Sequence, residues 1–539
     1  MSIVLTKEEK HALDVIREMN PTLYFAINGH RTHRGNRLNF ERNAFQMQIY
    51  HDIHPNISIT KSTQCGISEW LMATAIGSAY IGKNVFYVLP TGNLVGRFVR
   101  ERFDKTMQVT PIYRSLGAQD KDQGRRNAMS VSMKQLGPGT IAFVGSNSPA
   151  GFTEFAADIA IIDELDRCDQ TNILMAPERL SASDFENRRE IKVSNPTITG
   201  FGIDTEYART DQQEWFLTCP HCGHKFAPNW FKNVVKEIAP GQYLILDPEW
   251  DHESMNDIRL MCDKCGKPVD RYGHGEWVPQ YPNRAGMNWG RRGYHISKLF
   301  SANVSIVDML DRFEKAEANE ELMTRFWNAD LGLAYDAPGA RITRPMLDAC
   351  IDQHIRGAIP GDGAAIAGID VGAQLHVCIG HMRYGESGIR LIDAQAVRSP
   401  GDIVHLLRQY NVKTFVIDGL PETRMSRALA HAFAGGFMCF YAKGKRDVIG
   451  KDHVVSVDRT SALDNVKSAI MMKALHLYAG ADTTPDLFDH ITASTRMFDP
   501  EANAGEGAYT WNEGSKPDHY FHAMSYMLMA GRILLMARG

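Results

Sequence analysis

The sequence of 539 residues lacks several features that would assign it to a specialised class of protein. No apolar run reaches the roughly 18 residues that cross a bilayer, and the longest, near Ala523–Met536, contains Arg532. The N-terminal stretch carries charge where a signal peptide needs apolar residues. Internal repeats and low-complexity tracts are also absent, which argues against fibrous and repeat proteins. We therefore expect a soluble, cytoplasmic protein.

Charge of one sign is lacking as well. The 59 basic and 63 acidic residues give a net charge of −4, which excludes a histone-like polycation. An enzyme that binds nucleic acid through local basic groups remains compatible with this balance. The hydrophobic content of 44% is typical of globular proteins. A chain of this length exceeds one hydrophobic core and predicts about three domains.

A disulfide framework is not indicated, because nine is an odd number of cysteines and the chain is long. Four of them form two Cys-x-x-Cys-Gly motifs, Cys219/Cys222 and Cys262/Cys265. Four such thiolates suit a tetrahedral, structural Zn²⁺ site. The 39 residues between the pairs exceed the usual ribbon spacing, so we expect a β-structured insertion there. His221 or His224 would be the alternative ligand.

Apolar strands alternate with helical patterns between residues 56 and 197, which predicts a parallel sheet with helices on both faces. Residues 212–280 break this pattern with the cysteine pairs, and residues 303–331 are helical. Pro and Gly clusters then predict a linker, after which a second α/β pattern begins at Ala364. The expected strands of the first pattern are Ile57–Thr60, Asn84–Leu89, Thr140–Val144, Ile159–Ile162 and Ile191–Val193. Helices are expected over Ser68–Ile81 and Gly96–Met107.

The first expected strand leads into a glycine-containing loop and then a helix. This is the geometry of a phosphate-binding loop, in which backbone N–H groups at a helix N-terminus receive an anion. The loop departs from G-x-x-x-x-G-K-[ST], because Ile67 stands where the lysine belongs and Lys61 stands at the first position. A cation at the other end of the loop can reach the same phosphates. Taken alone, the segment fits a plain strand–turn–helix equally well. Its residues are Lys61, Ser62, Thr63, Gln64, Cys65, Gly66, Ile67 and Ser68.

Two acids end the strand Ile159–Ile162, about a hundred residues after the loop. In this position Asp163 would bind Mg²⁺ through water, and Glu164 would polarise the water that attacks the γ-phosphate. The next strand ends in Asn195-Pro196-Thr197, which could sense loss of the γ-phosphate and pass it on. Arg125-Arg126 is either an arginine finger or a solvated pair.

The C-terminal pattern runs strand, strand, strand, helix, strand from Ala364 to Asp418. Three consecutive strands followed by a crossover predict a ribonuclease-H-like sheet rather than a Rossmann unit. Asp370 on the first strand and Asp418 at the end of the fourth would then lie side by side. Two such carboxylates repel each other unless cations bind, which is how a two-metal nuclease is built. Asp518, at the start of a late helix, supplies a third acid.

Four motifs together resemble one family: KSTQCGIS, IIDELDRC, NPT and CPHCGH. They are similar to the large terminase subunit of tailed phages, most closely the lambda-type, GpA-like branch, whose loop lysine is displaced in the same way. The resemblance covers roughly residues 40–340 and, more weakly, the C-terminal part. It implies a motor that hydrolyses ATP to push double-stranded DNA into a procapsid, and a nuclease that cuts concatemeric DNA.

The resemblance also implies site residues and partners. ATP would sit between Lys61, Gly66, Ser68 and Asp163, and Asp370, Asp418 and Asp518 would hold two Mg²⁺ or Mn²⁺ ions. Terminases often carry D-x-x-x-D-A at the late helix; here His522 replaces the second Asp, which makes it a further candidate ligand. The implied partners are double-stranded DNA, the portal protein and a small terminase subunit. The chain would act as a homo-oligomeric ring, a pentamer when docked on the portal, in the host cytoplasm and not in the mature virion.

The expected organisation has four parts. Residues 1–55 form an N-terminal arm and adenine-side segment, and residues 56–340 a P-loop ATPase of the ASCE type, with a zinc ribbon at about 212–280 and a helical lid at about 290–335. Residues 341–363 are a linker, and residues 364–539 the ribonuclease-H-like nuclease. One alternative is a helicase-like DNA repair nuclease, which needs a second motor core. The other is a zinc-dependent DNA-binding scaffold with an inactive P-loop, supported by Ile67.

Overall fold

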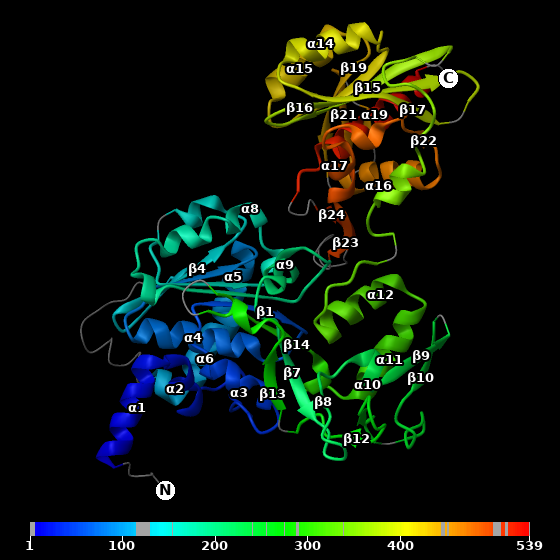
Figure 1. Ribbon diagram of the computed structural model, residues 1–539. Coiled ribbons are helices and arrows are strands. Elements are labelled where there is room, and N and C mark those ends of the chain that lie inside the picture. Colours follow the sequence, from blue (N-terminus) through cyan, green and yellow to red (C-terminus); the bar gives the residue numbers. More distant parts are fainter. Residues whose placement is uncertain are drawn as a thin grey trace. The chain divides into compact units, whose positions relative to one another are not determined.

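The computed structural model forms two compact units, Met1–Ala337 and Pro338–Gly539 (Figure 1). Residues 6–537 are described except for 115–129, 154, 240, 255, 274, 287–289, 338, 360, 387, 443–447, 450–451, 500–507 and 513–515. The pair Arg125-Arg126 therefore lies outside the described residues. Within the described ranges, no helix combines the length and the apolar character needed to span a membrane.

The first unit is built on a sheet whose centre is parallel, in the order β14-β1-β6-β5-β2-β4. These strands are almost entirely apolar because helices cover both faces, and each of those predicted from the sequence is present. The strand before the phosphate loop and the strand ending in Asp163 flank β6, so all three carboxyl ends meet at one edge. The central strands are β1 (Asn56–Lys61), β2 (Val85–Leu89), β4 (Gly139–Gly145), β5 (Ile159–Asp163), β6 (Arg189–Ser194) and β14 (Arg292–Ile296).

Antiparallel strands extend the sheet at both ends. β3 (Met133–Leu136) pairs with β4 at one end. At the other, β7 (Gln213–Thr218) pairs with β13 (Gly275–Pro279), and both lie beyond β14. The cysteine-containing insertion leaves the sheet between these two strands. It therefore grows from the edge of the ATPase sheet rather than from its centre.

Helix α4 (Ile67–Tyr80) is apolar on all sides because it is buried on all sides. Part of the expected N-terminal arm is the reason: α2 (Pro21–Ile27) packs on α4, with Leu23 and Phe25 buried. The contact is close, since a Cβ on Gly77 would lie 3.0 Å from the backbone of Pro21. Residues 21–27 are thus core structure and not an exposed basic arm. The other helices of this segment are α1 (Lys7–Met19) and α3 (Ala44–His51).

The insertion and the helical segment after it follow the predicted order. Between the cysteine pairs lie α10 (Trp230–Asn233) and a hairpin of β9 (Val235–Ala239) and β10 (Gln242–Ile245). This hairpin is the β-structure that the long spacing predicts. After β14 come α11 (Ile306–Glu317) and α12 (Glu320–Arg325). The last turn, η8 (Phe326–Leu331), is a π-helix.

The second unit has the ribonuclease-H-like order β19-β18-β15-β16-β17. β15 (Gly363–Val371), β16 (Leu375–Arg383) and β17 (Ile389–Val397) are antiparallel neighbours, and β18 (Thr414–Asp418) runs parallel to β15. β19 (Gly436–Tyr441) is parallel to β18. The predicted three-strand meander and crossover are therefore present. The crossover helix is α14 (Pro400–Gln409), followed after β18 by α15 (Thr423–Ala432).

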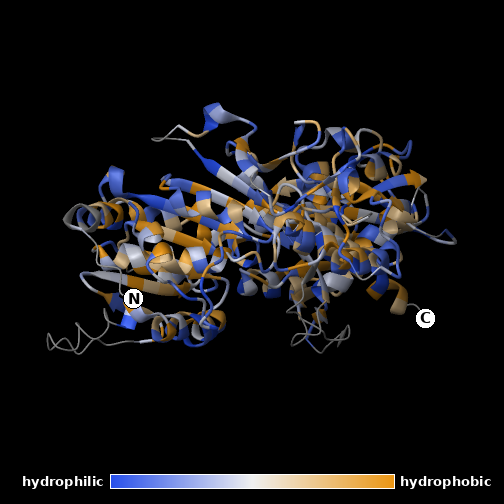
Figure 2. Cartoon of the chain, turned by 90° about the horizontal axis from the view of Figure 1, so that it is seen from below, coloured by the Kyte–Doolittle hydropathy of each residue, from blue (hydrophilic) through white to orange (hydrophobic). Residues whose placement is uncertain are grey.

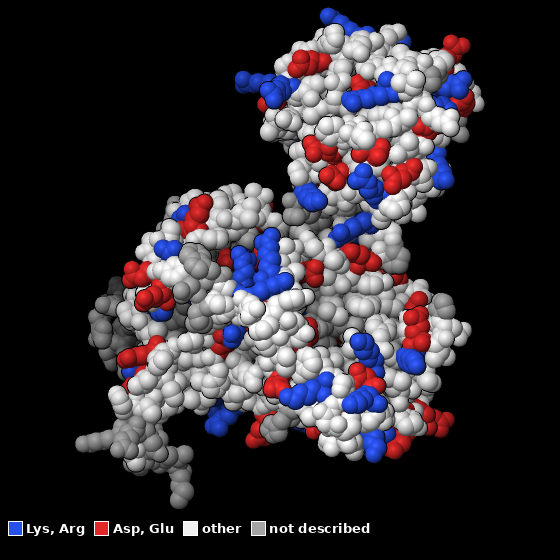
Figure 3. All heavy atoms as spheres, in the orientation of Figure 1, with Lys and Arg blue, Asp and Glu red and all other residues white. Residues whose placement is uncertain are grey.

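The C-terminal helix α19 (His519–Met536) crosses the other face of this sheet, over β15, β16 and β18. It comes very close at Gly368, where a Cβ would meet the Ala523 carbonyl oxygen at 2.0 Å and the Met527 nitrogen at 2.1 Å. Only glycine fits there. Hydrophobic residues concentrate on the strands and on the helix faces that cover them (Figure 2). Lys and Arg alternate with Asp and Glu on the face shown in Figure 3, as expected from the small net charge.

Candidate active sites and metal centre

The phosphate loop is held from beneath by two neighbouring segments. The Ser62 N–H donates to the carbonyl of Ile296 at 2.7 Å, and Thr63 donates both its N–H and its hydroxyl to the carbonyl of Ala329, at 2.9 and 3.1 Å. Gly66 has φ +83° at the N-cap of α4. These contacts fix the first half of the loop, so that the following residues present the N-terminus of α4, where an anion is favoured.

A glutamine outside the predicted loop braces it. Gln46 of α3 donates its side-chain N–H to the carbonyl of Cys65 at 2.7 Å. A Cβ on Gly66 would lie 2.6 Å from the same Gln46 nitrogen, so this contact requires glycine. Ile67, the residue in place of the usual lysine, is 1% exposed and belongs to the core. Its side chain points away from solvent, which explains why Lys61 must supply the cation.

Asp163 lies at the carboxyl end of β5 and is buried. The Tyr87 hydroxyl donates to its Oδ2 at 3.0 Å. Burial raises the pKa of Asp163 to about 6, although the nearby charge of Lys61 opposes the shift. Lys61 and Asp163 are thus electrostatic neighbours, as the predicted nucleotide site requires.

Glu164 follows in a left-handed turn, with φ +60°. Its carboxylate pairs with Arg167 at 2.9 Å, and its side chain is 42% exposed. The predicted water-activating acid is therefore at the sheet edge next to Asp163. In this conformation it is held by an arginine three residues later.

Asp166, which we did not single out in the sequence, anchors the segment Asn195-Pro196-Thr197. Its Oδ2 accepts hydrogen bonds from the Thr197 N–H at 3.0 Å and from the Thr197 hydroxyl at 2.8 Å, and its Oδ1 accepts from the Ile203 N–H at 2.7 Å. Burial raises the pKa of Asp166 to about 7, although these donors oppose the shift. The acid strand and the expected coupling segment are therefore joined directly.

Two asparagines extend this connection to the phosphate loop. Asn195 donates through Nδ2 to the carbonyl of Lys61 at 2.9 Å and to the carbonyl of Asn328. Asn328, in the π-turn η8, donates to the carbonyl of Thr197 at 2.8 Å. Gly332 ends this turn with φ +70°, and a Cβ there would lie 2.7 Å from the Ser62 nitrogen. Loop, coupling segment and helical segment thus share one hydrogen-bond network.

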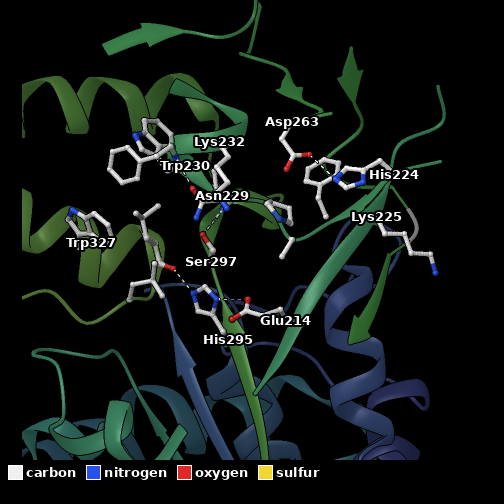
Figure 4. A pocket seen from close by; sticks show the side chains of 17 residues that line it. Glu214, His224, Lys225, Asn229, Trp230, Lys232, Asp263, His295, Ser297 and Trp327 are labelled. Atoms are coloured by element: carbon white, nitrogen blue, oxygen red, sulfur yellow. Dashed lines mark hydrogen bonds and ion pairs between the residues drawn. The ribbon is translucent and has the colours of Figure 1, made fainter. Parts of the chain in front are cut away.

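A pocket of about 410 Å³ lies behind this network, between α10 and the end of the π-turn (Figure 4). His295 forms part of its wall and joins two elements: its Nδ1 lies 2.8 Å from Glu214 Oε2, and its Nε2 lies 2.9 Å from the Leu331 carbonyl oxygen. Burial lowers the pKa of His295, but Glu214 and this carbonyl outweigh burial and raise it overall. Protonated His295 therefore ties β14 to the turn that supports the phosphate loop.

This pairing predicts a pH dependence of stability in the first unit. A histidine whose folded pKa is raised contributes stability that is complete below its unfolded pKa of about 6.5 and is lost as pH rises through the folded value. We expect His295→Gln to destabilise the unit by about 1–3 kcal/mol at low pH and to flatten the decline above pH 6.5. Tryptophan fluorescence during urea unfolding measures this, because seven of the eight tryptophans lie in this unit. His405→Gln, in the other unit, is the control; identical pH slopes for wild type and H295Q would contradict the prediction.

The four paired cysteines converge. Cys219 and Cys265 have their sulfur atoms 3.7 Å apart, and Cys222 and Cys262 have theirs 3.9 Å apart. A tetrahedral ion with bonds of about 2.3 Å to sulfur requires edges of about 3.8 Å. All four sulfurs lie within 4.8 Å of one another. The arrangement suits a metal that is fully enclosed by thiolates.

The two motifs have the same turn. In each, the glycine that follows the second cysteine donates its N–H to the carbonyl of the first cysteine at 2.9 Å, Gly223 to Cys219 and Gly266 to Cys262. Both glycines have positive φ, +71° and +64°. The repeated Cys-x-x-Cys-Gly sequence is therefore two copies of one ligand-bearing turn.

In the second unit, Asp370 and Asp418 occupy one row of the sheet. β15 and β18 pair Ile369 with Ile417, so the next residue on each strand is the aspartate. Burial raises the pKa of Asp418 to about 6, and the negative charge of Asp370 contributes to the shift. The two predicted carboxylates are thus neighbours on the face that α19 covers. A cation between them would relieve their repulsion.

Asp518 lies farther along the same face and has other partners. It accepts a hydrogen bond from the Ser494 hydroxyl at 2.6 Å, and its Oδ2 is 3.4 Å from His522 Nε2. Burial opposes ionisation, but His522 and Ser494 keep the pKa of Asp518 below its ordinary value. The other nitrogen of His522 is 2.9 Å from the Tyr441 hydroxyl. His522 therefore links Asp518 to the sheet, and it also influences the pKa of Asp418.

The residue of α19 that contacts Asp370 is His519, with Nδ1 2.9 Å from Asp370 Oδ2. His376 joins them from β16, as the direct cross-strand partner of Asp370. The rings of His376 and His519 stack with centroids 4.6 Å apart. One ligand atom from each of Asp370, His376 and His519 lies within 4.8 Å of the others. Neither histidine was predicted as a site residue.

Comparison with known families agrees with both sites. The family model "Phage terminase large subunit gpA, ATPase domain" matches residues 40–278, and "Terminase large subunit gpA, endonuclease domain" matches residues 291–403. Together the two models match more than half of the chain. The chain belongs to the gpA family of phage terminase large subunits.

Solved structures add a likeness of fold. The large terminase of bacteriophage HK97 is 12% identical, with a TM-score of 0.52, and the match covers 95% of this chain and 99% of that chain. A large terminase from a thermophilic bacteriophage is also 12% identical, with 89% and 94% of the chains covered, but at a TM-score of 0.27 it carries no argument. Comparison with curated protein sequences gave no match.

Membership in the family establishes the activities of this terminase large subunit. It is an ATPase and an endonuclease that act in phage DNA packaging and genome cutting. The ATPase domain implies a nucleotide and the nuclease domain a divalent metal ion. The prediction of a GpA-like terminase with a P-loop ATPase and a ribonuclease-H-like nuclease is therefore confirmed.

Proposed function

We propose that the phosphate loop, Lys61 to Ser68, binds the phosphates of ATP, with Lys61 as the cation for the β- and γ-phosphates. Asp163 would hold Mg²⁺ through water, and Glu164, once released from Arg167, would orient the attacking water. The single observation that supports this best is the convergence of Lys61 and Asp163 on one sheet edge, where the charge of Lys61 opposes protonation of Asp163. Asn195 and Thr197 would then transmit the state of the nucleotide to the helical segment.

We propose that Asp370 and Asp418 hold the divalent ions of the nuclease, with Asp518 as the third acid and His522 as a further ligand. The fit rests on the two adjacent buried carboxylates, which repel each other without a cation. Mg²⁺ or Mn²⁺ bound there would polarise the scissile phosphate and activate water.

We propose that the four cysteines hold a structural Zn²⁺ ion. We expect one zinc per chain by metal analysis, and we expect Cys262→Ser to lose it together with several kcal/mol of stability. Structural zinc supplies about 10–16 kcal/mol in isolated zinc-finger peptides, of which an insertion supported by a larger domain needs only part. Cys168→Ser, at a buried cysteine outside the cluster, is the control. A C262S protein that keeps full zinc content and an unchanged unfolding temperature would remove the site.

We propose further that the subunit translocates double-stranded DNA as a pentameric ring docked on the portal protein of the procapsid, and that a small subunit delivers the DNA. It would work in the bacterial cytoplasm and leave before the virion matures. The helicase-like alternative has no support in the fold of the described residues, where one parallel ATPase sheet and one nuclease sheet account for both units. The scaffold alternative predicts that the loop hydrolyses no ATP.

The decisive experiment measures ATP hydrolysis by the purified chain with and without double-stranded DNA, and strand separation on a forked duplex. We expect hydrolysis that DNA stimulates, without strand separation. Unwinding of the fork would support the helicase alternative. Hydrolysis that stays at background with DNA and procapsids present would support the scaffold.

A further inference from the structure

Three imidazoles surround Asp370, and the fold places each of them there. His376 is opposite Asp370 in the β15–β16 pairing, so both side chains point to the face under α19. His519 begins α19 and reaches Asp370 from above. His490, from α17 (Leu487–Ala493), packs against both rings, with centroids 5.3 Å from His376 and 5.5 Å from His519.

Two of these rings carry buried nitrogens without a partner. The Nδ1 atoms of His376 and His490 have no hydrogen-bond partner among the described residues, and the two residues are 5% and 7% exposed. An unsatisfied buried nitrogen costs about 1–3 kcal/mol. Such a cost, in a cluster that also contains a buried carboxylate, is explained if a ligand completes it.

His522, the histidine that replaces the family's second aspartate, is less available. Its two nitrogens face the Tyr441 hydroxyl and the Asp518 carboxylate. His519 bonds Asp370 through Nδ1 and is 39% exposed along its side chain. Within α19, His519 is therefore the imidazole placed to share an ion with Asp370.

We propose that Asp370, His376 and His519 form a carboxylate–bis-imidazole site that binds a transition-metal dication such as Mn²⁺ in preference to Mg²⁺. Imidazole nitrogen suits transition metals, whereas Mg²⁺ prefers oxygen ligands in octahedral geometry. The inference rests on the proposed nuclease function and states which ion occupies the Asp370 position. It gives His376 and His519 the role of ligands, and it assigns His490 to the wall of the site.

The test uses the full-length, zinc-loaded chain without nucleotide, titrated with Mn²⁺ and followed by EPR. We expect one Mn²⁺ per chain at this site, with ¹⁴N modulation from imidazole in pulsed EPR. His376→Leu and His519→Leu should each lose part of the modulation and weaken binding at least about tenfold, since loss of even an outer-shell partner costs 10–100-fold. The double variant should lose the modulation entirely, and equimolar Mg²⁺ should not displace Mn²⁺.

The control is His381→Leu, at another buried histidine of β16 that lies outside the cluster. If H376L fails to fold, H519L carries the test, because its side chain is partly exposed. Bound Mn²⁺ without ¹⁴N modulation in the wild type, or its displacement by equimolar Mg²⁺, would overturn the inference and leave the nuclease proposal intact. Failure of the nuclease proposal is separate: plasmid cleavage would then be the same in wild type and Asp370→Asn.

Discussion

Asp370→Asn is expected to slow DNA cleavage by about a hundred- to a thousandfold, while ATP hydrolysis continues at the wild-type rate. The asparagine keeps the size of the side chain but removes the charge that, as proposed, holds the ion of the nuclease. Loss of one electrostatic contact to a transition state typically costs a factor of this order. Nicking and linearisation of supercoiled plasmid with Mn²⁺ measure the first activity, and phosphate release by the same preparation measures the second.

A matched control for this variant is Asp393→Asn. Asp393 is also a buried aspartate of the same sheet, but it pairs with Arg356 and accepts a hydrogen bond from Tyr410. It should therefore alter stability without altering the chemistry. Cleavage by D370N at the wild-type rate would exclude Asp370 from the nuclease site. Equal loss in D370N and D393N would point to unfolding of the unit instead.

Lys61→Ala is expected to reduce ATP hydrolysis by about a hundred- to a thousandfold, with DNA cleavage unchanged. Because Ile67 is buried in the core, no second cation occupies the usual lysine position of the loop. Removal of Lys61 also removes the charge that keeps the pKa of Asp163 from rising above about 6, so the acid should become harder to ionise. Steady-state hydrolysis with saturating DNA is the measurement.

Lys83→Ala provides the comparison, since Lys83 follows the opposite end of α4 and is also partly buried. It should hydrolyse ATP normally. If K61A retained the wild-type turnover, the loop would have to bind phosphate through its backbone and the helix terminus alone. The assignment of Lys61 as the displaced lysine would then be wrong.

The strands were predictable because buried parallel strands are apolar throughout, and acids at their ends mark the carboxyl edge. Asp163, Asp370 and Asp418 follow from that pattern. His376 does not, because its pairing with Asp370 depends on a short hairpin, Gly372 to Gln374, whose length fixes the register. The hairpin length was the available signal. A count back from the turn would have placed a histidine opposite the aspartate.

Asp166 and Asn328 were missed for a different reason. Each acts through hydrogen bonds to segments about 30 and 130 residues away along the chain, Thr197 in both cases. Local patterns carry no record of such partners. Burial of a charged or amide side chain is visible only once the fold brings its partners together.

The π-turn at Phe326–Leu331 has a mechanical implication. A π-helical turn contains an extra residue, so its conversion to α-helix would rotate every earlier position by roughly 100° about the axis. Asn328 and Ala329 would swing away together, and Asn195 and Thr63 would lose their acceptors in a single event. Rewinding of one turn would thus act as a latch whose two settings differ by a whole step, with no intermediate setting.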